Sequence, residues 1–124
     1  MTKKKIAIFG WDPEAFFIYN SWPGLTKEML QSQVDADIAS LLALGYDAKA
    51  HYIFTPDTAY ESVTNTLNAE SFDVILVGAG VRKVDANFLL FEKIINAIHL
   101  AAPKAKICFN TNPADTADAV KRWI

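Results

Sequence analysis

The residues VILV at positions 74–77, followed by GAG at 78–80, decide the fold of this 124-residue chain. All four side chains of VILV are apolar, whereas a strand with one face in water alternates between apolar and polar residues. A strand buried on both faces is typical of a parallel sheet between two layers of helices. VILV therefore predicts the central strand of an α/β domain, and the glycines predict a turn at its carboxyl end.

Three further segments predict strands. Residues 6–9 and 107–109 are short apolar runs. In residues 48–54, two polar side chains, Lys49 and His51, alternate with apolar ones. This alternation is typical of a half-exposed strand at the edge of a sheet.

Helices are predicted between the strands from the spacing of apolar residues and from helix-start signals. The predicted segments are 27–45, 59–68, 86–101 and a last helix that starts at Pro113. The residues predicted to cap these helices are Thr26, Thr58 with Glu61, Asp85 and Asn112. The apolar residues predicted to face the core are Leu30, Val34, Ile38, Leu41 and Leu42 in the first helix, and Phe88, Phe91, Ile94, Ile95 and Ile98 in the third. Asp37 falls off the first of these stripes.

Strands and helices alternate along the chain without a linker, a repeat or a low-complexity tract. We therefore expect a single α/β domain over residues 1–124. Because crossovers between parallel strands are right-handed, the alternation predicts an open, three-layer parallel sheet with helices on both faces. The favoured strand order is 2-1-3-4, and 3-2-1-4 is the alternative.

Residues 11–25, WDPEAFFIYNSWPGL, form a long aromatic-rich insert after the first strand. Such connections commonly take about 2–6 residues. Asp12 and Pro13 are typical of a helix start, so we expect a short helix at 13–20 inside the insert. Its aromatic side chains have three interpretations: they fill space above the sheet, they clamp a planar ligand, or they anchor a second copy of the chain.

The carboxyl ends of the four strands are the expected ligand site, because open α/β sheets bind ligands there. Helix N-termini, Arg82 and Lys83 favour an anionic guest. The candidate site residues are Trp11, Asp12, Trp22, Gly78, Gly80, Arg82, Asn110 and Asn112. The site requires Trp11 and Gly80 to lie side by side beneath the insert. In the alternative interpretation the glycines only allow a turn, the two cations are solvated and Asp12 only caps a helix.

The sequence indicates no catalytic or metal-binding arrangement. His51 falls on the predicted edge strand and His99 near a helix end, and neither has a nucleophile in an obvious place beside it. A metal site commonly needs several converging ligands. Cys108 stands in an apolar run, which predicts a buried structural thiol. We therefore expect no metal, no cofactor and no catalytic residue, with Asp12 as the alternative base.

Charge and hydropathy limit the classes of partner. The chain has 12 basic and 14 acidic residues, a balance that argues against non-specific nucleic-acid binding. No apolar run approaches the ~20 residues of a membrane span, and the first residues do not resemble a signal peptide. The single cysteine allows no internal disulfide, which fits a reducing cytoplasm.

The VILVG segment at 74–78 and the AKICFN segment at 105–110 resemble the flavodoxin-like superfold. In length and rhythm the chain is most similar to the receiver domains of response regulators. The resemblance implies an open parallel sheet but no phosphoryl transfer, because Gly78 stands where a receiver has its phosphoacceptor aspartate. Lys83 likewise replaces the third glycine of a dinucleotide-binding loop. Fold alone does not confer function.

Two functions from different classes follow. The first is a non-catalytic cytosolic module that self-associates as a homodimer through the insert and can take a small anionic ligand at the carboxyl edge of the sheet. The alternative is a small enzyme acting on a phosphorylated or carboxylated metabolite. In that case Asp12 is the base, Arg82 holds the anion, and Asn110 or Asn112 orients the substrate.

Overall fold

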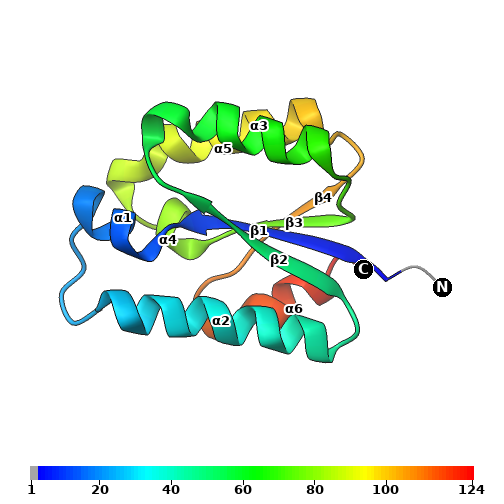
Figure 1. Cartoon of the computed structure of the whole chain (residues 1–124), viewed down its shortest axis with the longest axis horizontal. Coiled ribbons are helices and arrows are strands. Elements are labelled where there is room, and N and C mark those ends of the chain that lie inside the picture. The colour runs from blue at the N-terminus through cyan, green and yellow to red at the C-terminus, as the bar shows by residue number, and fades with distance from the viewer. Residues whose placement is uncertain (1–2) are drawn as a thin grey trace.

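The computed structural model describes residues 3–124 and shows an open, three-layer α/β fold (Figure 1). Four parallel strands lie in the order β2-β1-β3-β4. They are β1 (Lys5–Trp11), β2 (Asp47–Ile53), β3 (Val74–Val77) and β4 (Lys106–Phe109). The predicted order 2-1-3-4 is confirmed, and the alternative 3-2-1-4 is wrong.

Six α-helices connect or follow the strands in the described residues. They are α1 (Pro13–Tyr19), α2 (Lys27–Ala43), α3 (Ala59–Ala69), α4 (Ala79–Arg82), α5 (Phe88–Ala101) and α6 (Thr116–Lys121). Short 3₁₀ turns at Pro56–Thr58, Asp85–Asn87 and Pro113–Asp115 precede α3, α5 and α6. Helices α3 and α5 cover one face of the sheet, and α2 and α6 cover the other (Figure 1). None of the described helices has the length and apolar character needed to cross a membrane.

The central strand is buried on both faces, as VILV predicts. All four residues of β3 are buried. Ile75 and Val77 pack with Phe9 in the core beneath α3 and α5, whereas Val74 and Leu76 belong to the core beneath α2 and α6. Successive side chains of a strand point to opposite faces, so this short strand contributes side chains to the cores beneath both helical layers.

The buried stripe of α2 is narrower than predicted. Leu41 is fully buried, but Leu42 is 51% exposed. These two side chains are separated by about 100° around the helix, and only one of them can face the sheet. Asp37 was expected away from the stripe, yet its side chain is half-buried beside Thr116 of α6. The correction arises because α2 packs on α6 as well as on the sheet.

The start of α5 also differs from the prediction. A 3₁₀ turn at Asp85–Asn87 delays the helix, and the Asp85 side chain caps neither segment. Because α5 starts at Phe88, the helix is rotated about its axis relative to the prediction. The Phe88 side chain is 66% exposed, and Leu90 is buried instead. The predicted capping box of Thr58 is also wrong, because a 3₁₀ turn precedes α3 as well. Thr55 caps that turn by accepting a hydrogen bond from the Asp57 amide, and the Thr58 side chain caps nothing.

Candidate functional site

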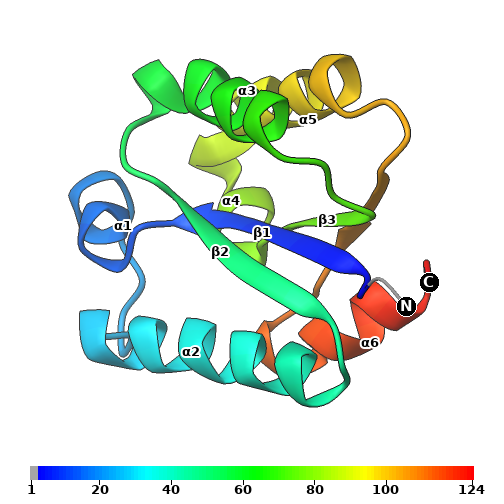
Figure 2. The ribbon, with the colours of Figure 1, turned by 45° about the vertical axis from the view of Figure 1, so that its right-hand side comes forward.

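The structure brings Trp11 and Gly80 together at the carboxyl edge of the sheet. Trp11 ends β1 and is buried. A Cβ atom at Gly80 would lie 4.0 Å from Trp11 Cδ1 and 3.6 Å from Cε2 of Phe16 in α1. Figure 2 shows α1 beside the end of β1, with α4 close behind. Aromatic side chains of the chain itself therefore occupy the space next to Gly80.

The insert forms a short helix for local reasons. Asp12 Oδ2 accepts hydrogen bonds from the amides of Glu14 (3.2 Å) and Ala15 (3.0 Å), which is the geometry of an N-cap. Pro13 follows at the first helical position, where its missing N–H costs nothing. The predicted helix at 13–20 is confirmed as α1, and Asp12 has a structural role as its cap.

An aromatic contact and two side-chain hydrogen bonds connect α1 and the residue after it with the neighbouring strand end and loops. The ring of Tyr19 stacks on Trp11 at 5.3 Å between centroids, and its hydroxyl donates to Thr55 Oγ1 at 3.2 Å. Asn87 Nδ2 donates to Asn20 Oδ1 at 3.0 Å. These bonds tie the end of α1 to the loop after β2 and to the turn before α5.

The insert aromatics divide between two roles. Trp11 and Phe16 are buried, with exposed fractions of 4% and 2%, so they fill space above the sheet. Trp22, which lies 6.5 Å from Phe16 between ring centroids, is 47% exposed. The packing interpretation therefore describes the first pair, and Trp22 remains available to a partner.

The cations near the glycines bind backbone carbonyls beyond β4. Arg82 Nη2 donates to the carbonyl of Asn110 at 2.7 Å, and Lys83 Nζ donates to the carbonyl of Thr111 at 3.0 Å. The guanidinium of Arg82 also lies 5.8 Å from the ring centroid of Phe109. These cations were expected either to hold an anion or to be solvated, and the structure gives them a third role as clamps between neighbouring strand ends.

A polar network continues from Asn110 toward α2. Asn110 Nδ2 donates to Thr116 Oγ1 at 3.0 Å. Burial raises the pKa of Asp37 to about 6, a hydrogen bond with Thr116 opposes this rise, and the charge of Asp115 adds to it. Sequence reasoning missed Asp37 and Thr116, because they meet only when α6 packs on α2.

The Asp115 carboxylate lies next to the residues that follow β4. It accepts from the amide and the hydroxyl of Thr111 and from the amide of Asn112. The hydrogen bonds from Thr111 are the main reason that the pKa of Asp115 is lowered. Asn112 Oδ1 accepts in turn from the Ala114 amide at 2.8 Å. The predicted cap at Asn112 is confirmed, and its reciprocal partner three residues later was a signal that the sequence carried.

Within the described residues, four buried side-chain atoms have no hydrogen-bond partner: Trp11 Nε1, His51 Nε2, Arg82 Nε and Asn110 Oδ1. Three of them belong to the carboxyl edge. An unpaired buried polar atom costs about 1–3 kcal/mol, so each is a place where a bound group would be stabilising. The two N–H groups would favour an acceptor, and the amide oxygen of Asn110 would favour a donor.

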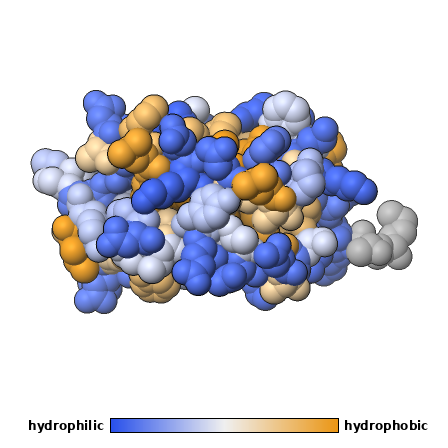
Figure 3. All heavy atoms as spheres, turned by 90° about the horizontal axis from the view of Figure 1, so that it is seen from above, coloured by the Kyte–Doolittle hydropathy of each residue, from blue (hydrophilic) through white to orange (hydrophobic). Residues whose placement is uncertain are grey.

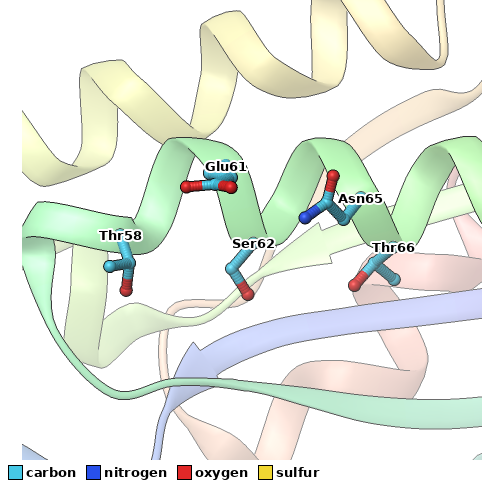
Figure 4. Close-up of a pocket in the computed structure, with 5 residues that line it drawn as sticks. All are labelled: Thr58, Glu61, Ser62, Asn65 and Thr66. Carbon is cyan, nitrogen blue, oxygen red and sulfur yellow. The ribbon is translucent and has the colours of Figure 1, made fainter.

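Two surface pockets in the described part of the chain lie apart from the candidate residues. Gly78 precedes α4, and its amide donates to the Phe9 carbonyl at 2.9 Å. A shallow pocket of ≈350 Å³ lies on the outer side of α3 (Figure 4); we call it the α3 pocket, and it is lined by Thr58, Glu61, Ser62, Asn65 and Thr66. A second, of ≈320 Å³, lies between α1 and α2 and is lined by Glu14, Phe17, Leu25, Thr26 and Lys27. None of the eight candidate residues lines either pocket.

The remaining titratable groups have structural surroundings. His51 lies between the rings of Phe9 and Phe72, at 5.4 and 5.6 Å between centroids. Burial, and then the charge of Lys49, lower its pKa. Burial raises the pKa of the Cys108 thiol to about 11, which makes it unreactive at neutral pH. Among the described residues, no three metal-binding side chains come together.

No protein-family model and no curated protein matches this chain. Its function is therefore inferred from its own residues and their arrangement.

Proposed function

We propose that this protein is a cytosolic, flavodoxin-like module that self-associates through an aromatic rim at the carboxyl edge of its sheet. The rim consists of seven large side chains: Ile18, Tyr19, Trp22, Phe54, Tyr60, Phe88 and Leu89. Their exposed fractions range from 40% to 72%, and this exposure is the observation that carries the proposal.

Hydrogen bonds between the elements of the rim indicate that its parts are neighbours. The bond from Tyr19 to Thr55 brings α1 next to the residue that follows Phe54. The bond from Asn87 to Asn20 brings the start of α5 next to the insert. In Figure 1, α1 and the first turns of α3 and α5 lie at the same end of the molecule. Figure 3, seen from above α3 and α5, shows hydrophobic residues among hydrophilic ones at that end.

The size of the rim fits an interface. Large aromatic side chains present about 150–250 Å² each, so the five aromatic residues of the rim offer roughly 400–650 Å² per protomer at these exposures, to which Ile18 and Leu89 add. The largest apolar patch on a typical monomer is about 300–600 Å², whereas a stable interface buries about 800 Å² per partner. A rim meeting its own copy across a twofold axis would approach that area.

Three features support a non-catalytic role. One oxygen of Asp12, the alternative base, is committed to capping α1. Arg82, the alternative anion holder, donates to a backbone carbonyl. Phe16 and Trp11 fill the place next to Gly80 where a substrate would enter. An enzyme at this edge would first have to displace its own aromatic side chains.

Light scattering on two matched variants tests the proposal. Trp22 and Trp123 are 47% and 51% exposed, and Trp123 lies outside the rim near the C-terminus. We expect Trp22→Asp to lower the molar mass of the assembly, because a carboxylate cannot be buried in an apolar interface without a partner. Trp123→Asp should leave the mass unchanged. Equal molar masses for the wild type, Trp22→Asp and Trp123→Asp would show that the rim does not mediate self-association.

The unpartnered buried atoms favour a second candidate, a small anionic ligand at the same edge. The N–H groups of Trp11 and Arg82 would each donate to a carboxylate or phosphate oxygen. A thermal-shift panel of phosphates and carboxylates tests this, because a ligand at ~100-fold its dissociation constant adds about 2.7 kcal/mol. Trp11→Phe removes one donor and keeps an aromatic ring. A stabilising ligand whose shift is the same in this variant and in Arg82→Lys would not use these donors.

A further inference from the structure

We infer that the outer edge of β2 pairs antiparallel with β2 of a second copy, which joins two four-stranded sheets into one of eight strands. This interface lies along the side of the sheet and adjoins the aromatic rim only at Phe54, which follows β2, and at Tyr60 of α3. It does not depend on the self-association proposed for the rim, because different atoms carry it.

The edge of β2 is regular and open. All seven residues of β2 are in unbroken parallel register with β1, and β2 is the first strand in the sheet order. The Asp47 amide bonds to Lys4 and the Ile53 carbonyl accepts from Asp12, so these two residues face inward. Backbone groups of a strand alternate in direction. The N–H and C=O groups of the three intervening even-numbered residues, 48, 50 and 52, therefore point outward.

The two edges of the sheet are protected differently. Strand β4 has only four residues, and Arg122 Nη2 donates at 3.0 Å to the carbonyl of Phe109. Because the Lys106 amide bonds inward to Asp73, the alternation places the Phe109 carbonyl on the outer side. Natural proteins commonly block a free edge with charges, proline or short strands. Strand β2 contains no proline, and Lys49 is its one cation.

A twofold axis at Ala50 satisfies the whole edge. In that register Ala50 faces Ala50 of the second copy, and Ala48 faces Tyr52 of the second copy in both directions. Each directly opposed pair of outward-facing residues exchanges two hydrogen bonds. The three pairs then use all the outward N–H and C=O groups of β2. Because the chain supplies both halves of this pattern, a second copy is the occupant that the edge fits.

The α3 pocket gives the second copy room above the strands. In Figure 4, Ser62 and Thr66 point from α3 toward the side where β2 passes. Neighbouring strands lie about 4.8 Å apart, so pairing of the two β2 strands would turn this flank of α3 toward the same flank of the second copy. Small hydroxyl side chains along this flank allow such an approach.

Light scattering at equal chain concentration, combined with amide hydrogen exchange, tests the inference. Ser62→Arg places a long cation between the two copies of α3, and Asn68→Arg, on the same helix but outside the α3 pocket, is the control; both positions are exposed. We expect Ser62→Arg to at least halve the molar mass, and Asn68→Arg to leave it unchanged. The amides of Ala48, Ala50 and Tyr52 should be protected in the wild type and lose protection in Ser62→Arg.

The double variant with Trp22→Asp separates the two interfaces. If both exist, Ser62→Arg with Trp22→Asp should be a single chain of 13.7 kDa. If only Ser62→Arg changes the mass, the rim proposal fails and the β2 inference stands. An unchanged mass in Ser62→Arg, or free exchange of the three amides in the wild type, would overturn the pairing of β2. Ala50→Pro, which removes the central outward N–H, should give the same result as Ser62→Arg.

Discussion

Above β1 the carboxyl edge of the sheet is closed by aromatic rings, whereas above β4 it is closed by hydrogen bonds among charged and polar groups. Trp11 and Phe16 fill the first half. Arg82, Asn110 and Thr116 connect the second. Apolar packing is insensitive to pH and tolerates no loss of volume. The polar half depends on complete pairing and on protonation. The same edge should therefore respond to two different kinds of perturbation.

The largest effect is expected in the aromatic half. Phe16 is 2% exposed and packs over Gly80. Phe16→Ala should lower the free energy of unfolding by about 3–5 kcal/mol, through lost burial and the cavity left behind. Urea unfolding measures this directly. Leu100→Ala, at a position outside the rim that is 68% exposed, is the control and should change stability little. Similar losses of unfolding free energy for both variants would contradict the role of Phe16 in filling the carboxyl edge of the sheet.

A smaller effect is expected from breaking the polar half. Asn110→Ala removes the donor to Thr116 and leaves the groups around it less well paired. We expect a loss of about 1–3 kcal/mol in urea unfolding. Asn112→Ala, at the neighbouring exposed cap, should cost about 1 kcal/mol. An Asn110→Ala variant as stable as the wild type would show that the network contributes nothing to the edge.

The pH dependence should distinguish the halves most sharply. Because the pKa of Asp37 is raised to about 6 in the folded chain, its contribution to stability is present below its ordinary value near 4 and is lost as pH rises through 6. Asp37→Asn should therefore be more stable than the wild type at pH 7, by about 1 kcal/mol for a half-buried group. The difference should vanish at pH 4. Phe16→Ala should show a constant difference across this range.

Local patterns in the sequence were enough to predict the frame of the molecule. VILV predicts a strand buried on both faces without reference to any distant residue. The alternation of strands and helices predicted a parallel sheet but left two strand orders open, and the structure has the favoured one. The helix in the insert is also local, because Asp12 caps amides two and three residues away. Two of the predictions that failed concern the rotation of a helix about its axis: Leu42 and Phe88 are apolar, but their helices turn them outward.

The candidate site was only partly predictable, because its contacts are long-range. Arg82 and Asn110 were both expected at the edge, but a bond from one side chain to the other's carbonyl depends on how two strand ends meet. Asp37 and Thr116 are 79 positions apart in the sequence and share no motif. The exposure of Trp22 beside the buried Phe16 likewise depends on tertiary packing and could not be read from composition.

Hydroxyl-radical footprinting at low and high chain concentration tests the central claim, that the aromatic rim is covered by a second copy, most directly. Trp22 and Trp123 have nearly equal exposure in the single chain, so their oxidation rates should match when the protein is dilute. We predict that oxidation of Trp22 and Phe54 falls as concentration rises, while oxidation of Trp123 stays constant. Equal oxidation of Trp22 and Trp123 at every concentration would contradict the account.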